Sequence, residues 1–332
     1  MKKIIPQVVQ HPAPSPVTGI TVEQFVTHFN RNKDATKTLR PADGGEDWTR
    51  IISEPTVNRP GLLLAAFTRY FAPKRVQVIG NLELSYLATL EASARAERCH
   101  LLFAQSIPCV VFSRDHQPKP EFLDAARRQN TPVFMSAMET RDFINLSTIA
   151  LDELFAPKSK EMGSMVDVMG VGVILKGESG IGKSECVLGL IERGYALVAD
   201  DITEVKLLDQ SRVIGTSPEL MRNLMEVRGI GIINVEEMFG VRHIRHEKQV
   251  DLVVTLMPWE KMKDIERVGM DDRFTSILEV DIPHVILPVR PGRDVARLVE
   301  VAAMHQDLRR LGRNPAKVLN DRLIQQMAQK KP

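Results

Sequence analysis

A glycine-rich loop at residues 177–184 is the most specific chemical pattern in the sequence. It matches G-x-x-x-x-G-K-[ST] at every fixed position, and its residues are Gly177, Glu178, Ser179, Gly180, Ile181, Gly182, Lys183 and Ser184. Glycines in such a loop let backbone N–H groups approach phosphate oxygens without a side chain in the way. We expect Lys183 to contact the β- and γ-phosphates of a nucleotide and the Ser184 hydroxyl to bind Mg²⁺. The alternative is a glycine-rich turn that binds nothing.

Two adjacent aspartates, Asp200 and Asp201, follow a short apolar run at residues 195–199. Ligands of open α/β sheets bind at the carboxyl ends of the strands, so we expect the two carboxylates to divide metal binding and proton transfer between them. No histidine lies between His116 and His243, so a base close to the loop in sequence must be a carboxylate. The alternative is a turn in which aspartate caps a helix or shapes a loop.

The segment 224–235 places a glutamate and an arginine among aliphatic residues and glycines. Glu226 is a candidate second metal ligand, and Arg228 is a candidate for stabilising phosphate charge. A buried strand with a salt bridge explains the same residues equally well.

Three later arginines are candidates to complete a phosphate environment. Arg267 lies in the run IERVG, and Arg290 and Arg293 lie in PVRPGR, where proline and glycine restrict the loop. Arginine on a rigid loop binds phosphate through two parallel N–H donors. The alternative is a set of surface arginines in a turn.

The elements that must position these residues alternate between strands and helices. The apolar, β-branched run 171–175 predicts a strand directly before the loop, and 185–193 predicts a helix after it that Gly194 ends. Further strands are expected at 76–79, 109–112, 132–135 and 195–199, and further helices at 22–30, 84–98, 121–128, 140–155 and 294–311. This alternation predicts an α/β fold with a parallel sheet.

The same pattern predicts two α/β domains, a small N-terminal domain at 20–145 and a C-terminal P-loop domain at 150–320. Residues 1–19 are proline-rich and are expected to form a flexible arm, and residues 321–332 a basic tail. The N-terminal domain contains no nucleophile motif, metal-ligand spacing or glycine fingerprint, so we expect it to have a regulatory or assembly role.

The composition excludes several classes of protein. Of 332 residues, 43% are hydrophobic and 26% charged, which is typical of a globular chain rather than a disordered or fibrous one. A formal net charge of +2 and 5% aromatic residues argue against a nucleic-acid partner. No apolar stretch approaches the length of a membrane span or a signal peptide, so no membrane partner is expected. Cys99, Cys109 and Cys186 lack CxxC spacing, which favours reduced thiols in a cytoplasmic protein.

Four motifs together resemble the HPr kinase/phosphorylase family. They are GESGIGKSE at 177–185, LVADD at 197–201, MEVRGIGIINV at 225–235 and PVRPGRD at 288–294, and the third is the most specific of them. The resemblance covers about residues 20–320. It implies a C-terminal kinase domain that uses ATP and Mg²⁺, or in many members pyrophosphate, to phosphorylate a regulatory serine on the phosphocarrier HPr. It also implies the reverse phosphorolysis, with inorganic phosphate as acceptor and pyrophosphate as product, and a homo-hexamer.

The resemblance also implies roles for single residues. Asp201 would be the base in phosphorylation and the acid in the reverse step, and Glu226 would bind at the second metal position. Lys183 and Arg267 look like catalytic residues, and Ser184 looks like a Mg²⁺ ligand.

The sequence departs from the family at one place, where a His-Gly pair is usual and Met162-Gly163 stands here. A thioether neither holds nor donates a proton, so the histidine's part in phosphorolysis is missing. We expect the kinase direction to survive, because Lys183, Ser184, Asp201 and Glu226 are present. The alternatives are a P-loop kinase with another acceptor, such as a small alcohol, and a nucleotide-sensing regulator that has lost turnover. Transfer assays with HPr and with metabolites separate these readings.

Overall fold

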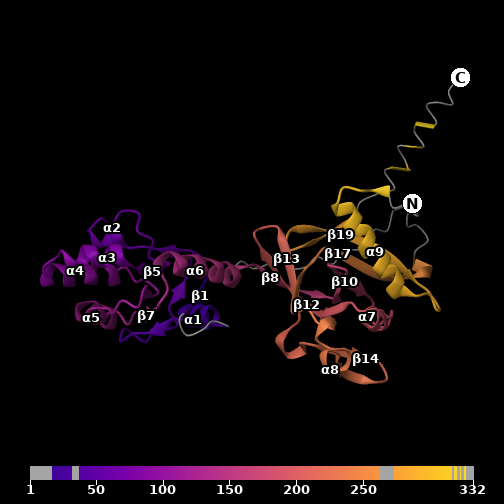
Figure 1. Cartoon of the computed structure of the whole chain (residues 1–332), viewed down its shortest axis with the longest axis horizontal. Helices are drawn as coiled ribbons and strands as arrows, with labels where there is room; N and C mark the ends of the chain where they lie inside the picture. Colours follow the sequence, from indigo (N-terminus) through magenta and orange to yellow (C-terminus); the bar gives the residue numbers. More distant parts are fainter. Residues whose placement is uncertain are drawn as a thin grey trace. The chain divides into compact units, whose positions relative to one another are not determined.

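The computed structural model describes residues 17–31, 37–261 and 273–315, together with 318, 319, 322, 325 and 326. Two compact units divide the chain between Ala156 and Pro157. Each unit is built from helices and strands (Figure 1), so the prediction of a two-domain α/β protein is confirmed. The expected arm and basic tail lie almost entirely outside the described residues. No helix within the described part of the chain is long and apolar enough to cross a membrane.

The first unit contains a five-stranded sheet and a separate pair of short strands. Its strands are β1 (Ile20–Thr21), β2 (Arg40–Pro41), β3 (Ile51–Ile52), β4 (Val57–Asn58), β5 (Val76–Ile79), β6 (Val110–Phe112) and β7 (Val133–Met135). The sheet order is β2-β7-β6-β5-β4, and β1 pairs with β3. Strands β4 to β7 run parallel, as the alternating pattern predicts, and β2 is antiparallel to β7.

The helices of the first unit follow from local signals in the sequence. They are α1 (Val22–Asn30), α2 (Gly61–Leu64), α3 (Asn81–Ala88), α4 (Ala92–Phe103), α5 (Pro120–Arg128) and α6 (Thr140–Phe155). At the start of α1, the Gln24 N–H donates to Thr21 Oγ1 at 3.1 Å and the Thr21 N–H donates to Gln24 Oε1 at 2.9 Å. This capping box stabilises a helix whose apolar side chains are buried in the unit's core.

The prediction of one helix over residues 84–98 is wrong, because α3 and α4 are separate helices. The Thr89 hydroxyl donates to the Tyr86 carbonyl at 2.7 Å, and Glu91 has an extended backbone with φ −60° and ψ 152°. Threonine competes with the helical hydrogen-bond pattern in this way. Hydrophobic spacing alone does not reveal such a break.

The second unit contains two larger sheets and a hairpin. Its strands are β8 (Lys158–Met162), β9 (Ser164–Val168), β10 (Val171–Gly177), β11 (Ala196–Ala199), β12 (Ile202–Leu208), β13 (Arg212–Thr216), β14 (Leu224–Val227), β15 (Gly231–Asn234), β16 (Glu247–Gln249), β17 (Leu252–Pro258), β18 (Phe274–Ile277) and β19 (Val280–Val289). The orders are β11-β9-β10-β17-β19-β18 and β16-β13-β12-β8, and β14 pairs with β15. Strands β10, β17 and β19 are parallel neighbours.

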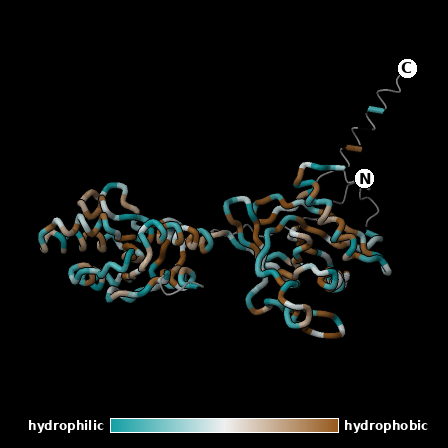
Figure 2. Tube along the Cα trace, viewed as in Figure 1, coloured by the Kyte–Doolittle hydropathy of each residue, from teal (hydrophilic) through white to brown (hydrophobic). Residues whose placement is uncertain are grey.

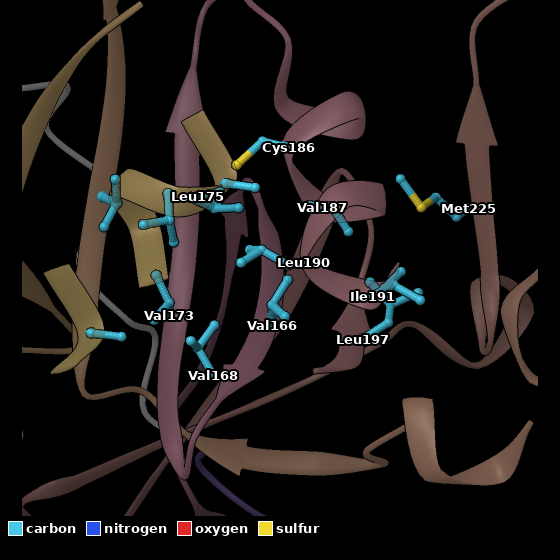
Figure 3. Packing of buried hydrophobic residues seen from close by; sticks show 14 of the residues in the cluster. Val166, Val168, Val173, Leu175, Cys186, Val187, Leu190, Ile191, Leu197 and Met225 are labelled. Atoms are coloured by element: carbon cyan, nitrogen blue, oxygen red, sulfur yellow. The ribbon is translucent and has the colours of Figure 1, made fainter. Parts of the chain in front are cut away.

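The described part of the second unit has three α-helices, and two of them, the first and the last, pack against the six-stranded sheet. The three helices are α7 (Lys183–Glu192), α8 (Val235–Phe239) and α9 (Val295–Arg310). Figure 3 shows side chains of α7 packed beside those of the sheet, with Leu190 close to Val166 of β9. Full burial of each such side chain stabilises the fold by about 1.5–3 kcal/mol. The strand, loop and helix that form the site are therefore fixed by one hydrophobic core.

Candidate active site

The glycine loop connects the end of β10 to the start of α7. Gly182 is the N-cap of α7 and has φ 101°. Gly180 has φ 83°, and a Cβ atom there would lie 3.2 Å from Arg228 Nη1. Both positions require glycine because L side chains rarely adopt a positive φ. The result is a loop whose backbone N–H groups lead into a helix N-terminus, an arrangement that binds phosphate.

One cavity of about 160 Å³ opens over the start of α7. It is lined by Ser179, Gly180, Gly182, Lys183, Ser184, Glu185, Asp201, Glu226 and Arg228. The structure thus brings eight of the residues singled out in the sequence, from three separate segments, to one place. Glu185 also lines the cavity; it ends the motif at 177–185, but the sequence assigned it no role.

Cationic side chains surround the loop. Lys183 Nζ donates to the carbonyl oxygens of Gly177 at 3.1 Å and Glu178 at 3.4 Å. Arg228 Nη2 donates to Ser179 Oγ at 3.4 Å. Lys261 Nζ forms an ion pair with Glu178 Oε1 at 2.6 Å. Phosphate oxygens accept hydrogen bonds from lysine more strongly than neutral carbonyls do, so a bound polyphosphate is expected to replace the carbonyl contacts of Lys183.

Asp201 reaches the cavity from an unusual backbone conformation. Its φ is 55°, in the left-handed region. The Asp201 N–H donates to Ser164 Oγ at 3.2 Å, and the Gly163 N–H donates to the Asp201 carbonyl at 2.8 Å. Backbone strain of this kind persists only where surrounding contacts hold it. Ser164 and Gly163 therefore keep the Asp201 carboxylate at the cavity.

Asp200 lies behind the cavity rather than in its lining and is 3% exposed. Its Oδ1 accepts a hydrogen bond from the Ser164 hydroxyl at 2.8 Å, and its Oδ2 accepts one from the Glu226 N–H at 3.0 Å. Burial raises the pKa of Asp200, and these donors offset part of that increase. Asp200 therefore connects the start of β9 and the middle of β14 behind the site. Sequence reasoning missed Ser164, since a lone serine carries no spacing signal.

Glu226 and Arg228 lie on and next to the β14–β15 hairpin. Glu226 is exposed between two buried neighbours, Met225 and Val227. Figure 2 shows a hydrophobic stretch in this hairpin, where Ile230 is 74% exposed. The segment is therefore a hairpin with one exposed face and not the fully buried strand considered as an alternative.

The later arginines lie in different places. Arg290 and Arg293 line a neighbouring cavity of about 540 Å³, which shares Gly182 and Glu185 with the first. The Arg290 guanidinium stacks on the Trp259 ring, 3.2 Å from the ring centroid. Arg267 lies outside the described residues. Sequence reasoning also missed Trp259, because a tryptophan beside an arginine loop has no sequence signature.

Met162 ends β8 and pairs with Ile202 on β12, next in sequence to Asp201. It is 67% exposed. The position where the resemblance leads us to expect a histidine therefore faces the residue that follows the candidate base, and it carries an apolar side chain here.

Among the described residues, no group of three or more His, Cys, Asp or Glu side chains is arranged to hold a metal ion. The cavity offers the Ser184 hydroxyl and the carboxylates of Asp201 and Glu226. Mg²⁺ at phosphate sites is typically bound by one or two carboxylates, with water and phosphate oxygens completing its shell. These oxygen donors fit a Mg²⁺ ion that arrives with a nucleotide.

Comparison with known proteins places both parts of the sequence in one family. Residues 20–151 match the family model of the HPr Serine kinase N terminus, and residues 153–323 match that of the HPr Serine kinase C-terminal domain. The HPr kinase/phosphorylase of Caldicellulosiruptor bescii is 41% identical over 84% of this chain and 90% of its own length. The HPr kinase/phosphorylase of Leptospira biflexa serovar Patoc is 37% identical over 93% of this chain and 95% of its own length.

A solved structure of the HPr(Ser) kinase/phosphatase from Coxiella burnetii is 31% identical to this chain, with a TM-score of 0.45. The match covers 46% of this chain and 93% of the chain in that structure. Both halves of the sequence match the family models, and relatives with the same name match nearly end to end. The chain belongs to the HPr kinase/phosphorylase family.

Proposed function

We propose that this protein transfers the γ-phosphoryl group of ATP to a serine of the phosphocarrier HPr and reverses the modification by phosphorolysis. The observation that carries the proposal is the single cavity in which Lys183, Ser184, Asp201 and Glu226 meet. A phosphate loop, a carboxylate base and a second acid are the parts that phosphoryl transfer to an alcohol needs. The names of the relatives support HPr as the acceptor.

In the forward direction, the serine hydroxyl of HPr attacks the γ-phosphorus in line. Asp201 takes the hydroxyl proton, the bond from the γ-phosphorus to the bridging oxygen breaks, and ADP leaves. Lys183 and Arg228 neutralise charge that builds up on the phosphate oxygens. Mg²⁺, held by Ser184 and Glu226, would supply further charge neutralisation when bound.

In the reverse direction, an oxygen of inorganic phosphate attacks the phosphorus of phosphoserine. The bond between phosphorus and the serine oxygen breaks, Asp201 returns a proton to that oxygen, and pyrophosphate is the product. Arg290 and Arg293 support phosphate binding from the neighbouring cavity in this proposal, and the family pattern adds Arg267 as a catalytic residue. Asp200 positions the acids and does not itself contact the phosphates.

The proposal extends to the donor, the assembly and the compartment. ATP is the main donor and pyrophosphate a second one, and mass spectrometry of HPr after incubation with each donor tests this. The family pattern supports a homo-hexamer, which sedimentation velocity of the full chain tests, and an N-terminal domain that serves in regulation or assembly. Three free thiols support a cytoplasmic location.

The test of the mechanism is Asp201→Asn, with Asp209→Asn as its matched control. Both aspartates have a left-handed backbone, with φ 55° and 50°, and Asp209 pairs only with nearby Arg212 on an exposed turn. Loss of a positioned base slows transfer by about 10²–10⁴-fold, so we expect Asp201→Asn to abolish HPr phosphorylation and keep ATP binding. Asp209→Asn should behave as wild type. Undiminished phosphorylation by Asp201→Asn would refute the assignment of the base.

A further inference from the structure

The first unit contains a cavity of about 400 Å³ that the proposed reaction does not use. Its lining consists of Arg59, Arg114, Glu139, Thr140, Arg141, Ile144 and Asn145. The charged residues of this lining are three arginines and one glutamate. The cavity therefore has a positive lining, with hydrogen-bonding side chains and one aliphatic side chain beside it.

The cavity lies where an α/β sheet places its ligands. Arg59 directly follows β4, and Arg114 comes two residues after the end of β6. Because β4, β5 and β6 are parallel, their carboxyl ends share one edge of the sheet. Thr140, at the first turn of α6, closes the same edge, and its hydroxyl lies 2.7 Å from that of Ser113. Open α/β sheets bind ligands in the crevice at this edge.

A buried carboxylate orients the first arginine. Arg59 Nε and Nη2 donate to the two oxygens of Glu83 at 3.1 and 2.9 Å. The Glu83 side chain is 1% exposed, and its Oε2 also accepts a hydrogen bond from the Gly80 N–H at 3.0 Å. A two-point ion pair with a buried partner fixes the guanidinium in one orientation. Arg59 is thus held in place before any ligand binds.

The second arginine is held by strained backbone. Arg114 and Asp115 have φ values of 58° and 53°, which are unfavourable for residues other than glycine. Their N–H groups donate to the carbonyl oxygens of Met138 at 2.8 Å and Ser136 at 2.9 Å, which hold this conformation. Strain of this kind concentrates at ligand sites. Packing of the core gives no other reason for it, since the Arg114 side chain is 41% exposed.

The ion pairs of the cavity's other charged residues are weak enough for a ligand to displace. Arg114 Nη2 lies 3.1 Å from Glu139 Oε1, and both side chains are more than 40% exposed. Arg141 is 84% exposed and contacts only its neighbour Asp142, at 3.4 Å. Exposed pairs of this kind are worth about 0–1 kcal/mol. A phosphate dianion provides more acceptor oxygens and more charge than Glu139 does.

We propose that this cavity binds a small organic phosphate, meaning a sugar phosphate or a nucleoside monophosphate. The arginines would bind the phosphate group, and Thr140 and Asn145 would donate hydrogen bonds to hydroxyl or base groups. The volume exceeds what inorganic phosphate needs and lies in the range of small-molecule sites, about 300–1,000 Å³. Ile144 provides apolar contact for the organic part.

Isothermal titration of the full-length chain tests the proposal, with inorganic phosphate, glucose 6-phosphate and AMP as separate probes. The Lys183→Ala background weakens phosphate binding at the glycine loop of the second unit, and variants of the first unit then assign binding to its cavity. Arg114→Gln should weaken binding of the organic phosphates about tenfold or more, because it removes a charged hydrogen-bond donor. Glu139→Gln should strengthen binding, because it removes the competing carboxylate, and a misfolded variant does not gain affinity.

The matched control is Arg128→Gln, an exposed arginine of the same unit at the end of α5. That helix end precedes β7, so it lies at the amino edge of the sheet, away from the cavity. We expect Arg128→Gln to bind the probes as the background does. The proposal is overturned if no organic phosphate binds at millimolar concentration, if Arg114→Gln and Glu139→Gln leave binding unchanged, or if inorganic phosphate binds as well as glucose 6-phosphate and AMP. The titration measures binding to the first unit and not HPr phosphorylation, so a negative result does not contradict the reaction proposed for the second unit.

Discussion

Asp200 illustrates how a residue can act on a site without contacting substrate. Its two carboxylate oxygens accept hydrogen bonds from the Ser164 hydroxyl and the Glu226 backbone, and the same serine accepts a hydrogen bond from the Asp201 N–H. One buried carboxylate therefore sets the positions of the candidate base and of the candidate metal ligand. Loss of comparable supporting contacts around ligating groups typically costs 10–100-fold in activity or metal affinity.

Asp200→Asn is expected to lower the rate of HPr phosphorylation about 10–100-fold and to lower the unfolding free energy. The asparagine side chain has one acceptor oxygen, so it can accept a hydrogen bond from the Ser164 hydroxyl or from the Glu226 N–H but not from both. The NH₂ group of the asparagine would then face the other donor. The control is again Asp209→Asn, measured by the same kinetic and urea-unfolding assays. A wild-type rate in Asp200→Asn would show that Asp200 does not position the site.

The pH dependence of this destabilisation has a definite sign. Burial raises the pKa of Asp200 in the folded state above its ordinary 3.8, which applies to the unfolded state. At pH values between the unfolded-state pKa and the raised folded-state pKa, the folded state therefore binds more protons than the unfolded state. The stability that Asp200 contributes is then fully present below 3.8, falls as pH rises through the window, and is constant above it. Asn does not titrate, so the stability difference between wild type and variant should be larger in acid than at neutral pH. The opposite trend would mean that hydrogen bonding outweighs burial.

Met162 is the second residue whose substitution is informative. It faces Ile202, next to Asp201, at the position where the sequence resemblance implies a histidine. We expect Met162→His to raise the rate of phosphorolysis and to add a group titrating near neutral pH to its pH profile. Met162→Gln is the control for polarity without titration. If the histidine and glutamine variants behave alike, proton handling at position 162 does not limit the reverse reaction.

Sequence predicts residues of this site to different degrees. The loop residues and Asp201 follow from motif spacing and from the position of an acid after a strand, and the structure brings them to the same cavity. The location of Asp200 behind the cavity does not follow, because two adjacent aspartates look equivalent until burial distinguishes them. The role of Arg228 does not follow either, because the sequence 224–235 is equally compatible with a phosphate-binding arginine and with a salt bridge on a buried strand.

At the scale of elements, β10 connects the core to the phosphate loop. It pairs with β9 on one side and β17 on the other, and its Gly172 also contacts β16. The Gly172 N–H donates to Asp251 Oδ2 at 2.9 Å, and the Asp251 N–H donates to the Gly172 carbonyl at 2.8 Å. A Cβ atom at residue 172 would lie 1.9 Å from the Gln249 carbonyl oxygen. Glycine is therefore required by close backbone approach rather than by its own dihedral angles.

Gly172→Ala should lower the unfolding free energy of the second unit by about 1–3 kcal/mol, because backbone on one side of the contact must move. Urea unfolding followed by circular dichroism measures the change. Gly61→Ala is the control: its added Cβ would meet Glu83 Oε1 at 3.4 Å, an ordinary contact. That variant should change stability by less than about 0.5 kcal/mol. Equal stability of wild type and Gly172→Ala would contradict the close approach between β10 and β16.

Strand and helix periodicity predicts these elements better than it predicts their connections. The helix at 140–155 and the strand at 76–79 have the bounds expected from the sequence. The break between α3 and α4 depends on one threonine hydroxyl, which leaves the apolar spacing on either side unchanged. The hairpin at 224–234 depends on Gly229 and Gly231 with φ 83° and 103°, and a strand-like composition conceals that turn.

At the scale of the whole chain, the buried side chains form clusters that each belong to one unit. Two clusters draw on residues 20–151 and two on residues 165–303. Cooperative unfolding follows shared cores, so each unit is expected to unfold in its own transition. Sequence anticipated the two-unit organisation because the phosphate loop opens a second alternation of strands and helices after residue 166, but which residues share a core required the structure.

Differential scanning calorimetry of the full chain should therefore resolve two transitions that respond to different changes. ATP with Mg²⁺ at about 100 times its dissociation constant should stabilise the second unit by about 2.7 kcal/mol and leave the first transition in place. Phe103→Ala removes a fully buried ring that packs edge-on against Phe122 at 5.0 Å, and should lower only the first transition, by about 3–5 kcal/mol. Its control, Phe67→Ala, alters a half-exposed ring of the same unit. If ATP or Phe103→Ala moves both transitions together, the units share a cooperative core that their separate clusters do not reveal.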